Sequence, residues 1–144
     1  EDESYEKDRS HWFARLEQFG DAPERGRRCT GCFEQRFDRT ARYAMQHKFD
    51  VISSSLGISR WKDMDQINRA GKKAVESFNT IEYWTFNWRK QKGSQRMIEL
   101  SKQEGFYQQQ YCGCVYSLRD TNQWRVTHNR SKIKLGKDFY TLES

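Results

Sequence analysis

The fold is decided by residues 49–86, which read FDVISSSLGISRWKDMDQINRAGKKAVESFNTIEYWTF. Residues 49–53 and residues 81–86 are short apolar runs, and each is predicted to form a buried strand. Between them, residues 62–78 place apolar side chains at three- and four-residue steps, which is typical of an amphipathic helix. A strand, a helix and a second strand in this order predict a βαβ unit with parallel strands, and therefore an α/β protein.

Further helices are predicted on both sides of this unit. Their expected bounds are residues 5–19, 29–48, 94–104 and 117–124. Ser94 is expected to cap the third of them through its hydroxyl, and Gly105 is expected to end it. The side chains expected to face the core are Trp12, Phe13, Leu16, Phe19, Phe33, Phe37, Ala41, Ala44, Met45, Val51, Ile52, Met64, Ile67, Gly71, Ala74, Val75, Phe78, Trp84, Phe86, Met97, Ile98 and Ser101.

Composition limits the class of protein. A chain of 144 residues suits a single domain, which we place at residues 1–124, with a basic tail at residues 125–144. Leu, Ile, Val and Phe together number only 25, which is few for a complete α/β core. No apolar run is long enough to span a membrane, and the acidic start does not resemble a signal peptide. We therefore expect a cytoplasmic protein without disulfides or membrane contact.

Positive charge is concentrated in the second part of the chain. Residues 1–83 carry 15 basic and 15 acidic side chains, whereas residues 84–144 carry 11 basic and 5 acidic ones. This asymmetry favours a polyanionic partner, although an ordinary solvated surface would give the same count. Within it, Arg89, Lys90 and Lys92 are expected to be exposed and to contact nucleic-acid phosphates. The basic character continues through Arg119, Arg125, Arg130, Lys132, Lys134 and Lys137.

The four cysteines occur as two close-spaced pairs, Cys29-Thr30-Gly31-Cys32 and Cys112-Gly113-Cys114. The first pair falls where a helix is predicted to begin, and the positive end of a helix favours thiolate over thiol. Four thiolates can hold structural zinc or an iron–sulfur cluster, and the spacing alone leaves both open. A redox disulfide is disfavoured, because thioredoxin-like motifs follow a strand and this motif follows a loop. The three histidines, His11, His47 and His128, are expected on the surface.

Polar residues follow the first predicted strand. Ser54, Ser55 and Arg60 lie in the stretch directly after it. Open α/β sheets bind ligands beyond the carboxyl ends of their strands, so these three residues are candidates for a substrate pocket. A plain turn explains the serines equally well.

Three segments resemble the QueH-type epoxyqueuosine reductases. The first is RCTGCF at residues 28–33, with Arg36, Thr40, Ala41 and Ala44 after it. The second is SSSLGIS at residues 53–59, with Lys62 after it. The third comprises SQRMIELS at residues 94–101 and YQQQYCGCVYS at residues 107–117. The resemblance extends over residues 5–124 and rests on motifs in a fixed order.

The resemblance implies an iron–sulfur oxidoreductase that reduces epoxyqueuosine to queuosine at the wobble position of tRNA. The implied fold is a three-layer sandwich with a parallel sheet, similar to the adenine-nucleotide α-hydrolases (HUP, Rossmann-like). Cys29, Cys32, Cys112 and Cys114 would help to hold a [4Fe–4S] cluster with an adjacent iron ion. The implied partners are a tRNA with a queuosine-type wobble base and an electron donor.

One departure from the family concerns the start of the chain. The family begins with a strand followed by a Cys-Cys motif, and this sequence contains neither, so the domain is expected to be N-terminally incomplete. The alternative function is a non-enzymatic, zinc-stabilised RNA-binding module, which would use the same thiolates and the same basic face.

Overall fold

Two short parallel strands form the sheet of this chain. The computed structural model describes residues 5–107 and 109–134. Strand β1 (Val51–Ile52) pairs with β2 (Glu82–Tyr83), so that Val51 lies opposite Glu82. The Trp84 N–H donates to the Ile52 carbonyl at 2.9 Å, which extends the pairing by one hydrogen bond. The prediction of parallel strands in an α/β chain is confirmed, although both strands are shorter than expected.

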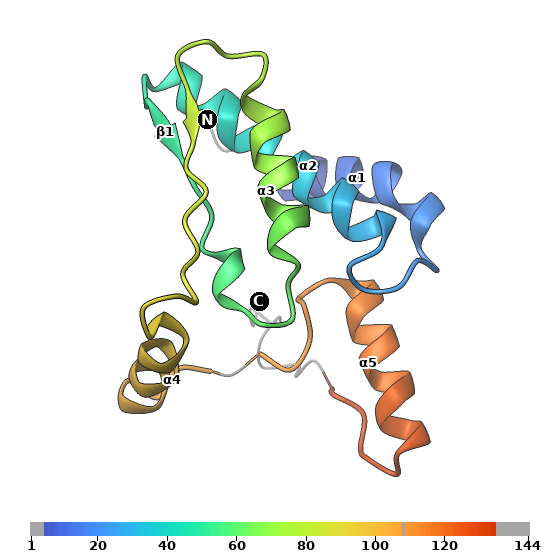
Figure 1. The fold of residues 1–144 in the computed structure, drawn as a ribbon. Helices are drawn as coiled ribbons and strands as arrows, with labels where there is room; N and C mark the ends of the chain where they lie inside the picture. The colour runs from blue at the N-terminus through green and yellow to red at the C-terminus, as the bar shows by residue number, and fades with distance from the viewer. Residues whose placement is uncertain (1–4, 108, 135–144) are drawn as a thin grey trace, which may run out of the picture. The chain divides into compact units, whose positions relative to one another are not determined.

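Helices make up most of the described chain (Figure 1). The chain divides into two units, Glu1–Phe106 and Tyr107–Ser144. The first unit contains the sheet, the helices α1 (Tyr5–Leu16), α2 (Arg27–Gln46), α3 (Met64–Val75) and α4 (Gly93–Gln103), and the 3-10 turns Glu17–Phe19 and Leu56–Ile58. The second unit contains α5 (Val115–Thr127). None of the described helices is both long enough and apolar enough to cross a membrane.

The core of the first unit lies between α2, α3 and one face of the sheet. Helices α2 and α3 pack against each other, and α1 packs against α2, where Leu16 is fully buried. The rings of Phe37 and Tyr83 meet edge to face with their centroids 5.3 Å apart. The buried cluster consists of Phe33, Phe37, Ala41, Ala44, Ile52, Ile67, Ala70, Ile81 and Tyr83. The residues that the periodicity predicted for the inner faces of α2 and α3 are therefore buried or half-buried, with the exception of Met45.

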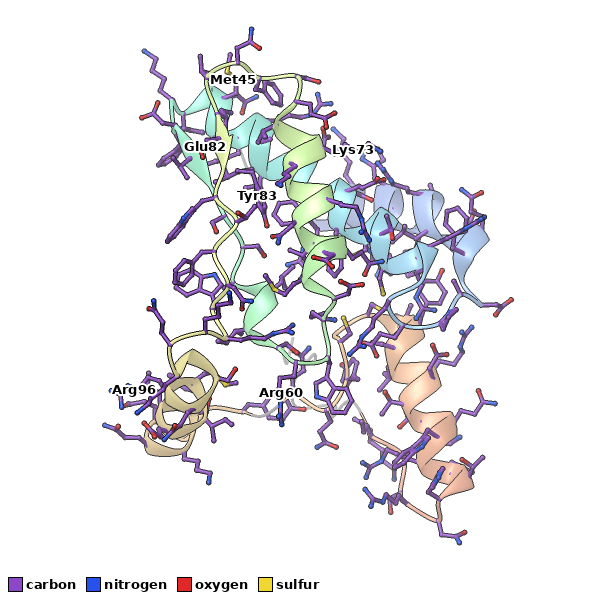
Figure 2. The ribbon with its side chains drawn as sticks, viewed as in Figure 1. Met45, Arg60, Lys73, Glu82, Tyr83 and Arg96 are labelled. Carbon is purple, nitrogen blue, oxygen red and sulfur yellow. The ribbon has the colours of Figure 1, made fainter. Side chains whose placement is uncertain are left out.

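Gly71 of α3 lies directly against the ring of Tyr83 on β2. A Cβ at this position would lie 2.3 Å from Cε2 of Tyr83, whose ring points from β2 toward α3 (Figure 2). Only glycine leaves room for the ring there. The Tyr83 hydroxyl is 3.2 Å from Asn68 Oδ1 on the same helix, and burial raises the pKa of Tyr83. The ring thus joins the second strand to the helix that precedes it.

Several side chains expected in the core are exposed instead. Val51 is 52% exposed because neighbouring residues of a strand face opposite sides, and Ile52 takes the buried side. Trp84 is 48% exposed, since a two-stranded sheet leaves its outer face uncovered among the described residues. Met45 is also exposed. Met97 and Ile98 are exposed as well, and no residue of α4 is buried.

All five helices differ by one to three residues from their predicted bounds, and α4 and α5 show this most clearly at their first turns. Helix α4 begins at Gly93, so Ser94 lies inside its first turn rather than at its cap. Lys92 occupies the cap position with a φ of 63° and makes no side-chain cap bond. Gly105, which was expected to end this helix, follows it with a φ of 64°. Helix α5 is longer at both ends than residues 117–124, while residues 135–144, including Lys137, lie outside the described residues.

Candidate functional site

The first cysteine pair lies in the opening turns of α2. Cys29 and Cys32 are three residues apart on this helix, so both sulfurs project from one side of it. Cys29 packs against the core cluster, and both side chains are half-buried. The indole Nε1 of Trp12, on α1, donates to the sulfur of Cys32 at 3.3 Å. A hydrogen bond of this kind stabilises negative charge on the sulfur and fixes the direction in which it points.

The start of α2 is held by hydrogen bonds from buried side chains, one on α3 and one on α2 itself. Its cap residue, Gly26, makes no side-chain cap bond. Instead Gln66, buried on α3, donates from Nε2 to the Arg25 carbonyl at 2.8 Å and to Thr30 Oγ1 at 2.7 Å. Arg28 is only 1% exposed and donates to the Gly20 carbonyl at 2.9 Å. The backbone that carries the cysteines is therefore fixed by packing on both sides.

A hollow of about 330 Å³ adjoins the first cysteine pair on the α1 side. It is lined by Arg15, Gln18, Phe19, Arg27, Thr30, Gly31 and Glu34. Glu34 accepts hydrogen bonds from Lys73 Nζ at 2.8 Å and from Arg15 Nη2 at 3.0 Å. These two cations, Lys73 above all, hold the pKa of Glu34 below its usual value. Glu34 is therefore ionised at neutral pH and joins α1, α2 and α3 by ion pairs.

The second cysteine pair lies at the start of α5. Cys114 is the N-cap residue of this helix, and its sulfur accepts the Ser117 N–H at 3.4 Å. The Ser117 hydroxyl donates to the Cys114 carbonyl at 3.0 Å, and Gly113 supplies the positive φ of 87° that the turn requires. Cys112 is exposed and Cys114 is half-buried. The capping role of Cys114 was not predicted from the sequence.

The donor set suits a thiolate-bound metal. All four cysteines are thiols in the structure, and each pair lies at the beginning of a helix. Within either unit, the described residues include no group of three or more His, Cys, Asp or Glu side chains that could hold a metal ion. The histidines are exposed, as predicted. Each unit thus offers one pair of sulfurs, a donor type that both zinc and iron–sulfur clusters accept.

The segment after β1 contains the three candidate substrate residues. The Ser54 hydroxyl accepts the Leu56 N–H at 3.1 Å, as the turn interpretation predicted. Ser55 is exposed and precedes the 3-10 turn Leu56–Ile58. Arg60 is exposed, and its side chain lies on the loop that follows this turn (Figure 2). Ser55 and Arg60 are therefore accessible, whereas the Ser54 hydroxyl is bonded to its own loop.

The three basic residues after β2 do not behave alike. Lys90 and Lys92 are exposed, as expected. The expectation that Arg89 is exposed was wrong, because this side chain is half-buried. Its guanidinium donates to the carbonyls of Gly57, Ser59 and Lys62, each at 2.6 Å. Three backbone carbonyls therefore bind this guanidinium, while a contact of Arg89 with nucleic-acid phosphate stays a prediction.

Aromatic side chains surround the same segment. Trp84, Phe86 and Trp88 lie in mutual contact, with ring centroids 4.8 to 6.0 Å apart. The Trp88 Nε1 donates to the Ser54 carbonyl at 2.9 Å. Phe86 is half-buried, which agrees only in part with its expected place in the core. The cluster ties the segment after β2 to the segment after β1.

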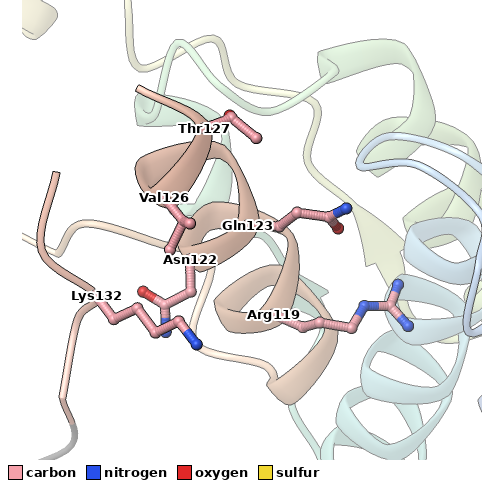
Figure 3. Close-up of a pocket in the computed structure, with 6 residues that line it drawn as sticks. All are labelled: Arg119, Asn122, Gln123, Val126, Thr127 and Lys132. Atoms are coloured by element: carbon pink, nitrogen blue, oxygen red, sulfur yellow. The ribbon is translucent and has the colours of Figure 1, made fainter. Parts of the chain in front are cut away.

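The second unit has a hollow of its own on α5 (Figure 3). Its volume is about 460 Å³, and its lining residues are Arg119, Asn122, Gln123, Val126, Thr127 and Lys132. Asn122 binds the chain that follows the helix, since its Nδ2 donates to the Ile133 carbonyl at 3.1 Å and its Oδ1 accepts the Ile133 N–H at 2.7 Å. None of the residues predicted for the metal or substrate site lines this hollow.

The fold and the paired thiols together define a mixed α/β protein with two close-spaced cysteine motifs. A family model described as epoxyqueuosine reductase QueH matches residues 2–120. The chain belongs to this family.

Similar curated proteins carry the same description, epoxyqueuosine reductase QueH. Those of Histophilus somni and Haemophilus influenzae are each 57% identical over 136 residues, which is 94% of this chain and 56% of the relative. That of Acinetobacter baylyi is 55% identical over 134 residues, or 93% of this chain and 62% of the relative. The chain thus spans little more than half the length of the first two relatives.

Proposed function

We propose that this chain is part of an epoxyqueuosine reductase, which reduces epoxyqueuosine to queuosine at the wobble position of tRNA. The observation that carries the proposal is the presence of two cysteine motifs in a chain of the QueH family. One motif lies at the start of α2 and the other at the start of α5. Both the tRNA substrate and the four thiols suit a reducing cytoplasm. In the whole protein we expect the sheet to be larger and to form a three-layer, HUP-like sandwich, in keeping with the exposed outer face at Val51 and Trp84.

Cys29, Cys32, Cys112 and Cys114 would help to hold a [4Fe–4S] cluster with an adjacent iron ion. When bound, such a group supplies electrons from an external donor and a Lewis acid for an epoxide oxygen. The Trp12 indole orients the sulfur of Cys32.

The substrate would be bound by residues beyond the strands. Lys90 and Lys92 are exposed and can contact tRNA phosphates. Ser55 and Arg60 offer an accessible hydroxyl and an accessible guanidinium for the nucleoside, while Ser54 shapes the turn beside them. A wobble base is unpaired, so its edges and faces are open to such contacts.

The test of the cofactor is iron binding by cysteine variants. The full-length protein, reconstituted anaerobically with iron and sulfide, should be brown with broad visible absorption. It should also remove one oxygen atom from epoxyqueuosine in tRNA, as measured by mass spectrometry. Cys112→Ser and Cys114→Ser should each lose iron. Serine is a strong N-cap residue, so Cys114→Ser keeps α5 capped while it removes the sulfur.

Val115→Ala serves as the matched control, because Val115 is exposed and adjacent to Cys114 but offers no ligand. Cysteine variants that retain stoichiometric iron would refute the ligand assignment. A colourless protein with one tightly bound zinc ion and no reductase activity would instead support the zinc-stabilised RNA-binding module.

A further inference from the structure

Two segments of the first unit are fastened to each other by side chains that bind backbone. They are residues 53–62, which follow β1, and residues 84–92, which follow β2. The Ser53 hydroxyl donates to the Trp84 carbonyl at 3.0 Å, and the Trp88 indole donates to the Ser54 carbonyl at 2.9 Å. Arg89 makes the remaining bonds between them. We call residues 53–62 the substrate loop, because Ser55 and Arg60 belong to it.

The guanidinium of Arg89 binds the second half of the substrate loop, residues 57–62. Its Nε donates to the Gly57 carbonyl, and its Nη2 donates to the carbonyls of Ser59 and Lys62. All three bonds are 2.6 Å long, and bonds from a charged donor are stronger than those between neutral groups. Only arginine offers several donors in one rigid plane, so lysine cannot reproduce this set.

A second arginine, Arg25, also binds this loop. Arg25 donates from Nε to the Trp61 carbonyl at 2.9 Å and from Nη2 to the Arg60 carbonyl at 3.2 Å. The carbonyl of Arg25 in turn accepts from Gln66, which also binds Thr30 between the first two cysteines. The substrate loop is therefore bonded both to Arg89 and to the segment that leads into α2, which carries the first cysteine pair.

We propose that Arg89 is a positioning residue for the substrate. It fixes the substrate loop so that Ser55 and Arg60 are presented to the nucleoside, and it acts through them rather than by touching a phosphate. Its guanidinium is already occupied by carbonyls, whereas Lys90 and Lys92 are exposed. This inference rests on the proposed function for its substrate, but the state of the loop can be measured without one.

The first experiment measures hydrogen exchange in the full-length protein and its Arg89→Lys variant. The amides of Ile58, Ser59 and Lys62, which bond within the loop, should exchange at least severalfold faster in the variant. The amides of α2 and α3 should be unchanged. Equal exchange in the loop would overturn the proposal. If Arg89→Lys does not fold, Trp88→Phe removes the bond to the Ser54 carbonyl and tests the same fastening.

The second experiment measures binding of an anticodon stem-loop that carries epoxyqueuosine. Arg89→Lys should weaken binding severalfold and leave the slope of log K against log salt unchanged. The effects of Arg89→Lys and Arg60→Gln should be less than additive, because one acts through the other. Loss of protein stability alone would give additive effects.

Two results of the binding experiment would also overturn the proposal. If Arg89→Gln lowers the salt slope by about one, Arg89 contacts a phosphate directly. If the two substitutions are additive, Arg89 does not act through Arg60. A wild-type protein that binds no such RNA would contradict the proposed function instead, and the exchange experiment would still decide whether Arg89 holds the loop.

Discussion

Glu34 shows how a single side chain joins three helices. It lies on α2 and accepts hydrogen bonds from Lys73 on α3 and Arg15 on α1. The bond from Lys73 is the main cause of its lowered pKa, and the charges of both partners add to it, while burial opposes them. A carboxyl whose pKa is lower in the folded state stabilises the fold above its ordinary pKa, and that contribution disappears as the pH falls through the lowered value.

Glu34→Gln should therefore destabilise the protein in a pH-dependent way. Both cationic partners are largely exposed, so we expect a loss of about 1 kcal/mol or less in the free energy of unfolding at pH 7. The difference from the wild type should vanish at a pH below the lowered pKa of Glu34. Urea denaturation at pH 7 and in acid measures it, with Asp38→Asn as a control for an exposed ion pair on the same helix. A difference that persists unchanged in acid would contradict the assignment.

Residue types could be predicted at the site, but their partners could not. The cysteine pairs and the exposure of Lys90 and Lys92 follow from spacing and charge. The inward turn of Arg89 does not, because its acceptors are carbonyls and leave no signature in the sequence. The cap role of Cys114 was missed for a similar reason, since cysteine is not among the residues that usually cap a helix.

At the scale of elements, Asp63 caps the N-terminus of α3 and determines where this helix begins. The carboxylate of this N-cap residue accepts the N–H of Asp65 at 2.9 Å and of Gln66 at 3.2 Å. The second of these residues is the one that holds the start of α2, so the cap also sets the place of Gln66. The helix was predicted over residues 62–78, but the cap fixes its first residue at Met64.

Asp63→Ala should lower the free energy of unfolding by about 1 kcal/mol, because two backbone donors lose their partner. Thermal or urea denaturation measures the change. Asp63→Ser is the matched control, since its hydroxyl can accept the same bonds, and it should recover most of the stability. Equal losses in the two variants would show that the carboxylate acts by something other than capping.

Helices were easier to predict than strands in this chain. The inner faces of α2 and α3 follow from apolar residues at helical steps, and all of those residues except Met45 are buried or half-buried. Strands β1 and β2 were located, but their outward side chains were misjudged. The burial of Val51 or Trp84 depends on what covers the sheet, which is a long-range property and is absent from the local pattern.

At the scale of the whole molecule, the excess of positive charge lies after residue 83. Charge reversal of two exposed residues there, Lys90→Glu with Lys92→Glu, should weaken tRNA binding by an order of magnitude or more. It should also lower the salt slope by about two, which corresponds to two lost phosphate contacts. Binding titrations between 50 and 200 mM salt, about the range over which such contacts weaken strongly, measure both quantities.

The control for this experiment makes the same change in net charge at two lysines in another part of the chain. Lys48 and Lys72 are exposed and lie in the electrically balanced part of the chain, so Lys48→Glu with Lys72→Glu makes the same change in net charge. This variant should lose little affinity. If both double variants weaken binding equally, net charge rather than the segment after β2 attracts the tRNA.

The contact between Gly71 and Tyr83 has a consequence for how this sequence can change over generations. While the tyrosine ring is present, any side chain at position 71 would collide with it, because even a Cβ would come within 2.3 Å of the ring. A smaller residue at position 83 must therefore arise first, before alanine or serine becomes tolerable at position 71. The geometry therefore sets the order of the two substitutions. A change at position 83 can precede one at position 71, but a change at position 71 cannot come first.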